Sequence, residues 1–460
     1  GDYPKFALWN SGGSPAQNAY FLTMNLFSNN TTFNGVRAYA LDRASMLTGG
    51  PAHAIGFTLS ATDVGASYSF VAATAKPFGD PPPTGRNEMV LAIDSPSTGG
   101  VTLTQVHARS FHVDFATPAN SVFGVGPTHQ PNAEITVNGF VDAFTNTTSD
   151  LVPQQGTSTK LDTLGDKIMT PVVYQNHGGT ESLWADQTVM ENYPNGPTAV
   201  RWYQFDVTGG NFPTTALQQQ SWDNTTDGLW RWMPSIAVDQ SGNTVIGYST
   251  SNTTIFPSIR YAGRLAADPP SNLAQGEAIM FAGVSRFNGN RWGDYTRTEV
   301  DPSDGMSFWH INQYAQNGDW HTRIGKFKFQ GVGGSPTPTP TPTATPMATA
   351  TPTATATATP TATPTPAAPR ALKATNVTTS SFTANWRSVT GATGYRLDVA
   401  TDSSFVNYVP GYQDLDVGNT TSHNVTGLQA RTIYYYRVRA YNGNGTSPNS
   451  NVVQVRTPRH

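Results

Sequence analysis

The sequence contains no cysteine and few charged residues. Its 460 residues include 27 Lys and Arg against 30 Asp and Glu, which gives a net charge of −3. The absence of cysteine excludes disulfides, thiolate zinc sites and cysteine nucleophiles. Balanced charge leaves no basic field to hold nucleic acid or an anionic membrane, so we expect no nucleic-acid partner. No apolar run approaches the roughly 20 residues of a transmembrane helix, so we expect no membrane span.

Familiar catalytic and metal-binding motifs are missing as well. The chain has no HExxH, no G-x-S-x-G, no P-loop and no dinucleotide-binding fingerprint. Its nine histidines are scattered singly, so neither a metal centre nor a cofactor is expected. The turns DQSGN (239–243) and DPSDG (301–305) have fewer carboxylates than a calcium loop needs and favour hairpin turns. A structural calcium ion stays open as an alternative.

Proline and glycine are abundant, with 34 and 43 residues, and indicate a turn-rich extracellular protein. The chain begins at Gly1 without a signal-peptide pattern, which we interpret as a leader that was removed or is not included. From 336 to 366 the sequence is almost entirely Pro, Thr and Ala, a composition that cannot form a core. We therefore predict a Pro/Thr-rich linker at 331–367 between domains at 1–330 and 368–460.

The segment 368–460 has the pattern of a small β-sandwich. The stretches YRLDV and YYYRVRAY alternate apolar and polar side chains, as strands with one buried face do. Trp386, Tyr395, Tyr434 and the run GLQARTIYYYRVRAYNGNG resemble a fibronectin type III domain. The resemblance implies a spacer or binding accessory, with Tyr434 as the tyrosine of the corner between two strands.

The segment 1–330 repeats itself. GDYPKFALWNSGG at the start and GDYTRTEVDPSDG at 293–305 are variants of one pattern, and weaker copies begin at 231 and 168. Each copy reads as strand, turn and strand, followed by a third strand that contains an arginine, at positions 37, 201, 260 and 323. Four strands repeated about every 65 residues predict an all-β chain with a β-propeller of about five visible blades. No fourth strand follows Phe329, so we expect either missing upstream sequence or a ring closed without the usual overlap.

Several stretches of this segment resemble a group of secreted bacterial propellers described as sialidase-like. They are DYPKFALW, YALDRASML, RWMPSIAVDQSGNTVIGYS, RWGDYTRTEVDPSDGMSFWH and TRIGKFKF. The resemblance implies a secreted or cell-surface protein and brings no established catalytic residues with it. The chain lacks the Arg-Ile-Pro motif of true sialidases, and SDGMSFW is out of register for an Asp box. We therefore do not expect sialidase activity.

A ligand site is predicted at the mouth of the central channel, where connections enter the innermost strands. The alignment of the repeats predicts that the following residues lie there: Asp2, Lys5, Asp166, Lys167, Arg231, Trp232, Arg291, Trp292 and Asp294. Indole faces beside planar polar groups suit a sugar ring. An alternative is that both tryptophans pack between blades. The arginines of the third strands are expected to form ion pairs or hydrogen bonds between blades.

Two functions of different classes fit this sequence. The first is a non-catalytic recognition protein whose propeller binds an extracellular glycan, another polymer or a cell-surface protein. The second is a carbohydrate-active enzyme, hydrolase or lyase, with Asp294, Tyr295, Glu299 and Glu181 as candidate catalytic residues. Glycosidases need two carboxyl groups about 5 to 9.5 Å apart. A carboxyl without a counter-ion would favour the enzyme, and carboxyls paired with arginine would favour recognition.

Overall fold

The computed structural model describes two β-rich units, Gly1–Thr345 and Pro346–His460, which are considered separately. The described residues are 2–29, 32–51, 53–65, 67–75, 79–95, 99–144, 148–223, 227–329, 366–442 and 445–459, without the side chain of Tyr68. Strands make up 56% of the described residues and helices 4%, so the expected all-β class is confirmed. The predicted linker falls almost wholly on 330–365, outside the described residues.

The first sheet of the N-terminal unit is an up-and-down antiparallel sheet. Its strands are β1 (Asp2–Gly13), β2 (Ala16–Ser28), β3 (Thr32–Asp42) and β4 (Ala54–Ser60). Two short helices, α1 (Arg43–Leu47) and α2 (Ala61–Val64), follow β3 and β4. Alternate residues of β1 are buried, from Tyr3 to Ser11, because a strand directs successive side chains to opposite faces.

The second and third sheets share hydrogen bonds. The second contains β5 (Ser67–Ala75), β6 (Glu88–Asp94), β7 (Leu103–His112) and β9 (Ala133–Asp142), with β8 (Val122–Phe123) beside β7. The third contains β12 (Val172–His177), β13 (Thr180–Met190), β14 (Thr198–Asp206) and β15 (Gln218–Trp222). A hairpin of β10 (Asp150–Gln154) and β11 (Thr157–Asp162) lies between them in sequence, and short 3₁₀ turns are at Pro118–Asn120 and Thr208–Gly210.

These two sheets close into a six-stranded barrel, where the repeat predicts separate blades. Strand β12 pairs in parallel with β5, and the end of the long strand β13 pairs with β9. The ring therefore runs β5, β6, β7, β9, β13, β12 and back to β5. A closed ring leaves these strands no free edge, which gives the middle of the unit a rigid frame.

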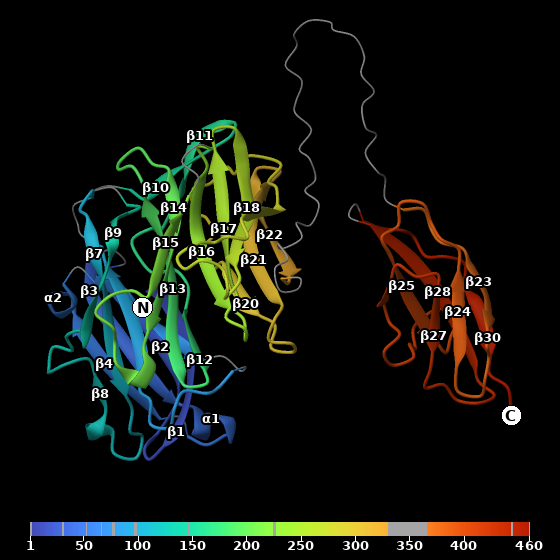
Figure 1. Ribbon diagram of the computed structural model, residues 1–460, viewed down its shortest axis with the longest axis horizontal. Coiled ribbons are helices and arrows are strands. Elements are labelled where there is room, and N and C mark those ends of the chain that lie inside the picture. The colour runs from blue at the N-terminus through green and yellow to red at the C-terminus, as the bar shows by residue number, and fades with distance from the viewer. Residues whose placement is uncertain are drawn as a thin grey trace, which may run out of the picture. The chain divides into compact units, whose positions relative to one another are not determined.

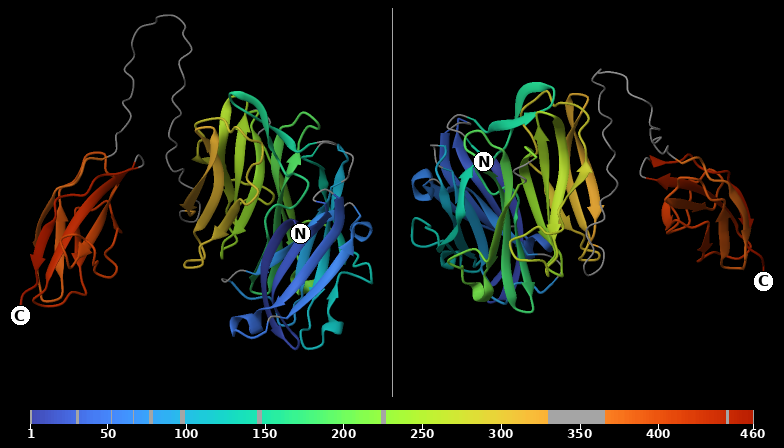
Figure 2. Two further views of the ribbon diagram at one scale, coloured as in Figure 1. Left: turned by 180° about the vertical axis from the view of Figure 1, so that it is seen from behind. Right: turned by 45° about the horizontal axis from the view of Figure 1, so that its top comes forward.

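The fourth and fifth sheets complete the unit. The fourth contains β16 (Trp230–Val238), β17 (Thr244–Asn252), β18 (Ile255–Arg264) and β19 (Glu277–Phe281). The fifth contains β20 (Arg297–Val300), β21 (Phe308–Gln316) and β22 (Asp319–Phe327). Figures 1 and 2 show the sheets following one another through the unit in chain order, from blue to gold. The predicted third strands are confirmed as β3, β14, β18 and β22.

The arginines of these third strands bond largely within their own sheet, so the expectation of hydrogen bonds between blades is met only in part: Arg201 also donates to the carbonyl oxygen of Asn138 on β9, in the second sheet, at 2.8 Å. Arg37 donates to Thr58 Oγ1 at 2.8 Å, and Arg201 donates to Ser221 Oγ at 2.9 Å. Each partner is the directly opposite residue of the next strand. Arg260 forms an ion pair with Glu277 of the adjacent strand β19. Arg323 differs, because its guanidinium lies 4.9 Å from the ring centre of Phe281 in the fourth sheet.

The C-terminal unit is a two-sheet sandwich. One sheet contains β23 (Ala371–Thr375), β24 (Phe382–Trp386) and β27 (Ser422–Val425). The other contains β25 (Gly394–Ala400), β26 (Leu415–Gly418), β28 (Ile433–Asn442), β29 (Gly445–Thr446) and β30 (Val453–Arg456). Trp386 and Tyr395 contact each other in its core, and the hydroxyl of Tyr434 accepts a hydrogen bond from the Gln429 N–H at 2.9 Å. This bond is the one expected of a corner tyrosine.

Candidate functional site

The first strands of three sheets carry the same irregularity at one end. Strands β1, β5 and β16 each have a bulge, and the residues Tyr3, Ser69 and Met233 within them have positive φ angles of 53°, 58° and 54°. A bulge bends a strand and redirects a side chain. Polar side chains of the preceding sheet accept the freed N–H groups, since Asn25 bonds to Ser69 N at 2.9 Å and Thr188 to Met233 N at 3.2 Å.

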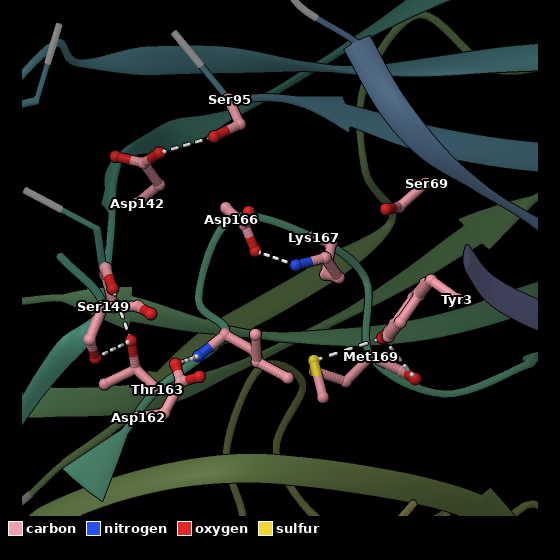
Figure 3. A network of polar contacts seen from close by, with 12 residues as sticks. Tyr3, Ser69, Ser95, Asp142, Ser149, Asp162, Thr163, Asp166, Lys167 and Met169 are labelled. Carbon is pink, nitrogen blue, oxygen red and sulfur yellow. Dashed lines mark hydrogen bonds and ion pairs between the residues drawn. The ribbon is translucent and has the colours of Figure 1, made fainter. Parts of the chain in front are cut away.

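The bulge in β1 brings the start of the chain to the loop before β12. The hydroxyl of Tyr3 donates to the carbonyl oxygen of Met169 at 3.0 Å (Figure 3). From the same loop Lys167 forms an ion pair with Asp166, as Figure 3 also shows. Burial raises the pKa of Tyr3 well above its ordinary value, and the nearby carboxylates of Asp166 and Asp294 raise it further. The structure thus brings together Lys5, Asp166, Lys167 and Asp294 around Tyr3, and we call this group with Asp186 and Arg297 the central cluster.

Lys5 is the most unusual member of the central cluster. Its side chain is 7% exposed, and no hydrogen bond or ion pair joins its ammonium group to any residue that the structure describes. The group lies 4.0 Å from the ring centre of Tyr3 and 5.7 Å from that of Tyr295. Burial lowers the pKa of Lys5 to about 8, helped by the charges of Arg297 and Lys167. Aromatic faces attract cations, but they replace only part of the lost hydration.

Asp186 on β13 is a buried carboxyl in the same cluster. It is fully buried and accepts a hydrogen bond from Thr170 Oγ1 at 3.2 Å. Burial raises the pKa of Asp186 to about 7, against the opposing effects of Thr170 and of the charges of Arg297 and Lys5. Within the described ranges no ion pair neutralises it. Two groups whose pKa values are shifted toward neutrality therefore lie close together, as they do in many acid–base sites.

An open cleft of about 460 Å³ lies beside the central cluster, between the loop before β20 and the strands β21 and β22. We call it the 291–322 cleft. Its lining consists of Arg291, Trp292, Gly293, Asp294, Tyr295, Thr296, Ile311, Asn312, Gln313, Trp320 and Thr322. Tyr295 is 73% exposed and Trp320 is 51% exposed, so the cleft presents two aromatic rings to solvent. Gln313, Asp294 and Arg291 add planar polar groups to the same wall.

The charged candidates at the edge of the cleft are paired. Arg291 forms ion pairs with Asp294 at 2.6 Å and with Asp162 at 3.3 Å, and Arg297 forms one with Glu299. Asp2 is exposed and adds to the negative charge around Arg291. Carboxylates held by guanidinium groups can orient hydroxyl groups, which suits a binding surface.

Four of the candidates are buried in the core or already engaged in ion pairs. The indoles of Trp232 and Trp292 are 0% and 1% exposed and belong to one core cluster, so their faces cannot stack on a sugar. Arg231 is 2% exposed and bonds to Glu277 at 2.7 Å and Asp227 at 2.8 Å. Glu181 is 1% exposed and bonds to Arg86 at 2.6 Å. Arg231, Trp232 and Glu181 are buried because the strands of the third and fourth sheets are covered on both faces, whereas Trp292 lies in the loop before β20 and packs in the core with Trp232.

The burial of Lys5 can be tested through the pH dependence of the free energy of unfolding. Its ordinary pKa is 10.5, so the unfolded chain binds more protons at this residue between about pH 8 and 10.5. The cost of burying the ammonium is fully present below pH 8 and disappears as the pH rises through that window. We expect Lys5→Met to raise the free energy of unfolding by about 2–3 kcal/mol at pH 7, with a smaller difference at pH 10.

Urea unfolding followed by tryptophan fluorescence measures this effect, because all ten tryptophans except Trp386 belong to the N-terminal unit. Lys326→Met is the matched control, since Lys326 is exposed and paired with Asp301 on the fifth sheet. If the free energies of unfolding of Lys5→Met and the native chain differ by the same amount at pH 7 and pH 10, Lys5 does not have the lowered pKa described above.

Within the described residues, no group of three or more His, Asp or Glu side chains is arranged to hold a metal ion. No helix in the described part of the chain is long and apolar enough to cross a membrane.

Comparison with known proteins identifies the C-terminal domain. The family model of the fibronectin type III domain matches residues 367–456, and this part of the chain is such a domain. Contactin-6 of Rattus norvegicus and of Mus musculus are each 36% identical over 98 residues, which is 20% of this chain and 9% of either relative. The chain therefore spans about a tenth of these relatives. Both findings indicate a modular protein of the extracellular or cell-surface type.

Two solved structures are similar to a part of the chain. The FN5 domain of Drosophila Lar is 28% identical, and the match covers 21% of this chain and 99% of that one with a TM-score of 0.18. The sixth fibronectin type III domain from human fibronectin type III domain containing protein 3 is 27% identical, with 20% and 83% covered and a TM-score of 0.17.

Proposed function

We propose that this chain is a secreted, non-catalytic recognition protein that binds an extracellular glycan in the 291–322 cleft. The N-terminal unit would be a sialidase-like bacterial β-propeller, and the fibronectin type III domain a spacer or accessory on a Pro/Thr-rich linker. The recurrence of up-and-down sheets supports the propeller, as do the equivalent bulges in β1, β5 and β16.

The observation that carries the proposal is the pair of exposed aromatic rings, Tyr295 and Trp320, in a cleft with planar polar groups. A sugar ring has an apolar face that packs on an aromatic ring and a rim of hydroxyls that bond to amides, guanidinium groups and carboxylates. Of the binding residues expected from the sequence, Arg291 and Asp294 keep their place in this proposal. Trp320 takes the role that the sequence gives to Trp232.

A polysaccharide array followed by affinity electrophoresis tests this proposal. We expect Trp320→Ala to weaken binding to the selected polysaccharide by about 2 kcal/mol, or roughly 30-fold, because a central aromatic contact is lost. Trp309→Ala is the matched control. Trp309 is a 40% exposed tryptophan on β21 that lies outside the cleft lining and bonds to Asp301. Equal affinity of the two variants, or no binding to any polysaccharide, would overturn the proposal.

The carbohydrate-active enzyme is kept as a second candidate because of Asp186. Its carboxyl has no described counter-ion, unlike Asp294, Glu299 and Glu181. Reducing-sugar release and the ultraviolet absorbance of unsaturated products would detect hydrolase or lyase activity in the native chain. Activity that Asp186→Asn abolishes would replace the recognition function. The absence of products from every polysaccharide that binds would remove the enzyme.

A further inference from the structure

The ammonium group of Lys5 lacks the anionic partner that a buried cation requires. Lys5 as a residue is 7% exposed, its ammonium group donates no described hydrogen bond, and two aromatic rings are its described contacts. Removing a charge from water without a paired opposite charge is costly. A ligand that supplies an anion at this point would recover that cost.

The carboxylates around Lys5 are mostly committed to other cations. Asp166 is paired with Lys167, and Asp294 is paired with Arg291. The cationic effects of Arg297 and Lys167 on Lys5 exceed the anionic effects of Asp294 and Asp186. The two cationic neighbours therefore favour an incoming anion over a cation.

Lys5 adjoins the 291–322 cleft. Tyr295 and Asp294 line the cleft, and the Lys5 ammonium lies 5.7 Å from the ring centre of Tyr295. The ring of Tyr295 is largely in solvent, so packing does not fix it between the cleft and Lys5. A sugar that stacks on Tyr295 would bring an acidic substituent of its ring toward the ammonium group.

We propose that Lys5 binds the carboxylate of a uronic acid residue, so that the cleft selects acidic polysaccharides. The inference rests on the proposed function, because it assumes a glycan in the cleft. A carboxylate fits better than a hydroxyl, since a charge-assisted hydrogen bond to a buried ammonium is about twice as strong as a neutral one.

The test compares acidic polysaccharides with their methyl esters, which keep the backbone and lose the charge. The probes are polygalacturonate, alginate and hyaluronan, each free and esterified, with the full chain. We expect the native chain to bind at least one free acid about tenfold more tightly than its ester. Lys5→Met should abolish this preference, whereas Lys326→Met, which changes the net charge equally, should keep it. Lys5→Met removes an unpaired buried charge, so the variant should fold, and its thermal unfolding is the check.

The outcomes separate the inference from the proposed function. A glycan that binds through Trp320 with equal affinity as acid and ester would overturn the role of Lys5 and leave recognition standing. So would a preference for the acid that Lys5→Met does not change. If none of the acidic or neutral polysaccharides binds, both the function and the inference fail.

Discussion

Replacement of Trp232 by alanine is expected to lower the free energy of unfolding of the N-terminal unit by about 3–5 kcal/mol, because a large cavity opens in a closed core. The indole is fully buried among Tyr3, Met169, Phe287 and Trp292. Its ring centre lies 6.4 Å from that of Trp292. Loss of this ring should also disturb the bulge that holds Tyr3, so binding would be lost indirectly.

Urea unfolding with fluorescence detection measures the effect, with Trp320→Ala as control. Trp320 is half exposed, and a surface substitution of this kind should change stability by about 0.5 kcal/mol or less. A stable Trp232→Ala variant that nevertheless fails to bind a polysaccharide would contradict the core position and restore a direct role in binding.

Glu277→Gln is expected to cost about 3 kcal/mol, because it breaks a buried ion-pair network. The carboxylate of Glu277 accepts hydrogen bonds from Arg231 at 2.7 Å, Arg260 at 2.5 Å and the Tyr248 hydroxyl at 2.7 Å. After the substitution the buried guanidinium of Arg231 keeps only Asp227 as a described ionic partner, and Asp227 is partly exposed. Arg260 loses its described anionic partner altogether, and the two guanidinium charges left with one partly exposed carboxylate are the source of the loss.

The effect of Glu277→Gln should depend on pH. Burial alone would raise the pKa of Glu277, but hydrogen bonds and charges from Arg231 and Arg260 outweigh it and hold the pKa below 4.5. The stability that the carboxylate contributes is therefore present above the ordinary pKa and is lost as the pH falls through the lowered one. Glu134→Gln, at a 54% exposed side chain, is the control, with little change expected at any pH. Equal losses in both variants would contradict the network.

The architecture could be predicted from the sequence wherever the pattern of strands and turns repeats. Arg37, Arg201, Arg260 and Arg323 lie on third strands, because alternation and turn residues recur around them. The joining of the second and third sheets into one barrel is not indicated by any repeated pattern in the sequence. It depends on the parallel approach of β5 and β12 and on the extra length of β13, which are properties of packing.

The candidate site could be predicted only in part. Alignment of the repeats predicts that Lys5, Asp166, Lys167 and Asp294 lie together, because they stand at or next to the loops that lead into equivalent strands. It failed to distinguish Trp232 from Trp320, since both lie in strands and their exposure depends on whether another sheet covers them. Strand β22 belongs to the last sheet and is largely exposed, which is why Trp320 reaches solvent.

Two further residues of the central cluster, Asp186 and Arg297, are not among the site residues predicted from the sequence. Asp186 lies in the middle of strand β13, and a carboxylate in a strand that is buried along nearly its whole length is a signal of function that sequence reasoning could have used. Arg297 follows the GDYT stretch directly, and the sequence pattern there indicates only a hairpin. Both act on Lys5 from other strands, and that proximity is set by the bulge in β1.

Hydroxyl-radical footprinting of the full chain, with and without the polysaccharide that the array selects, tests the binding site most directly. The bound glycan should reduce oxidation of Tyr295 and Trp320 several-fold and leave that of Trp309 unchanged. Unchanged oxidation of Tyr295 and Trp320, with protection confined to Trp309 or to the fibronectin type III domain, would place the ligand elsewhere and contradict the 291–322 cleft as its site.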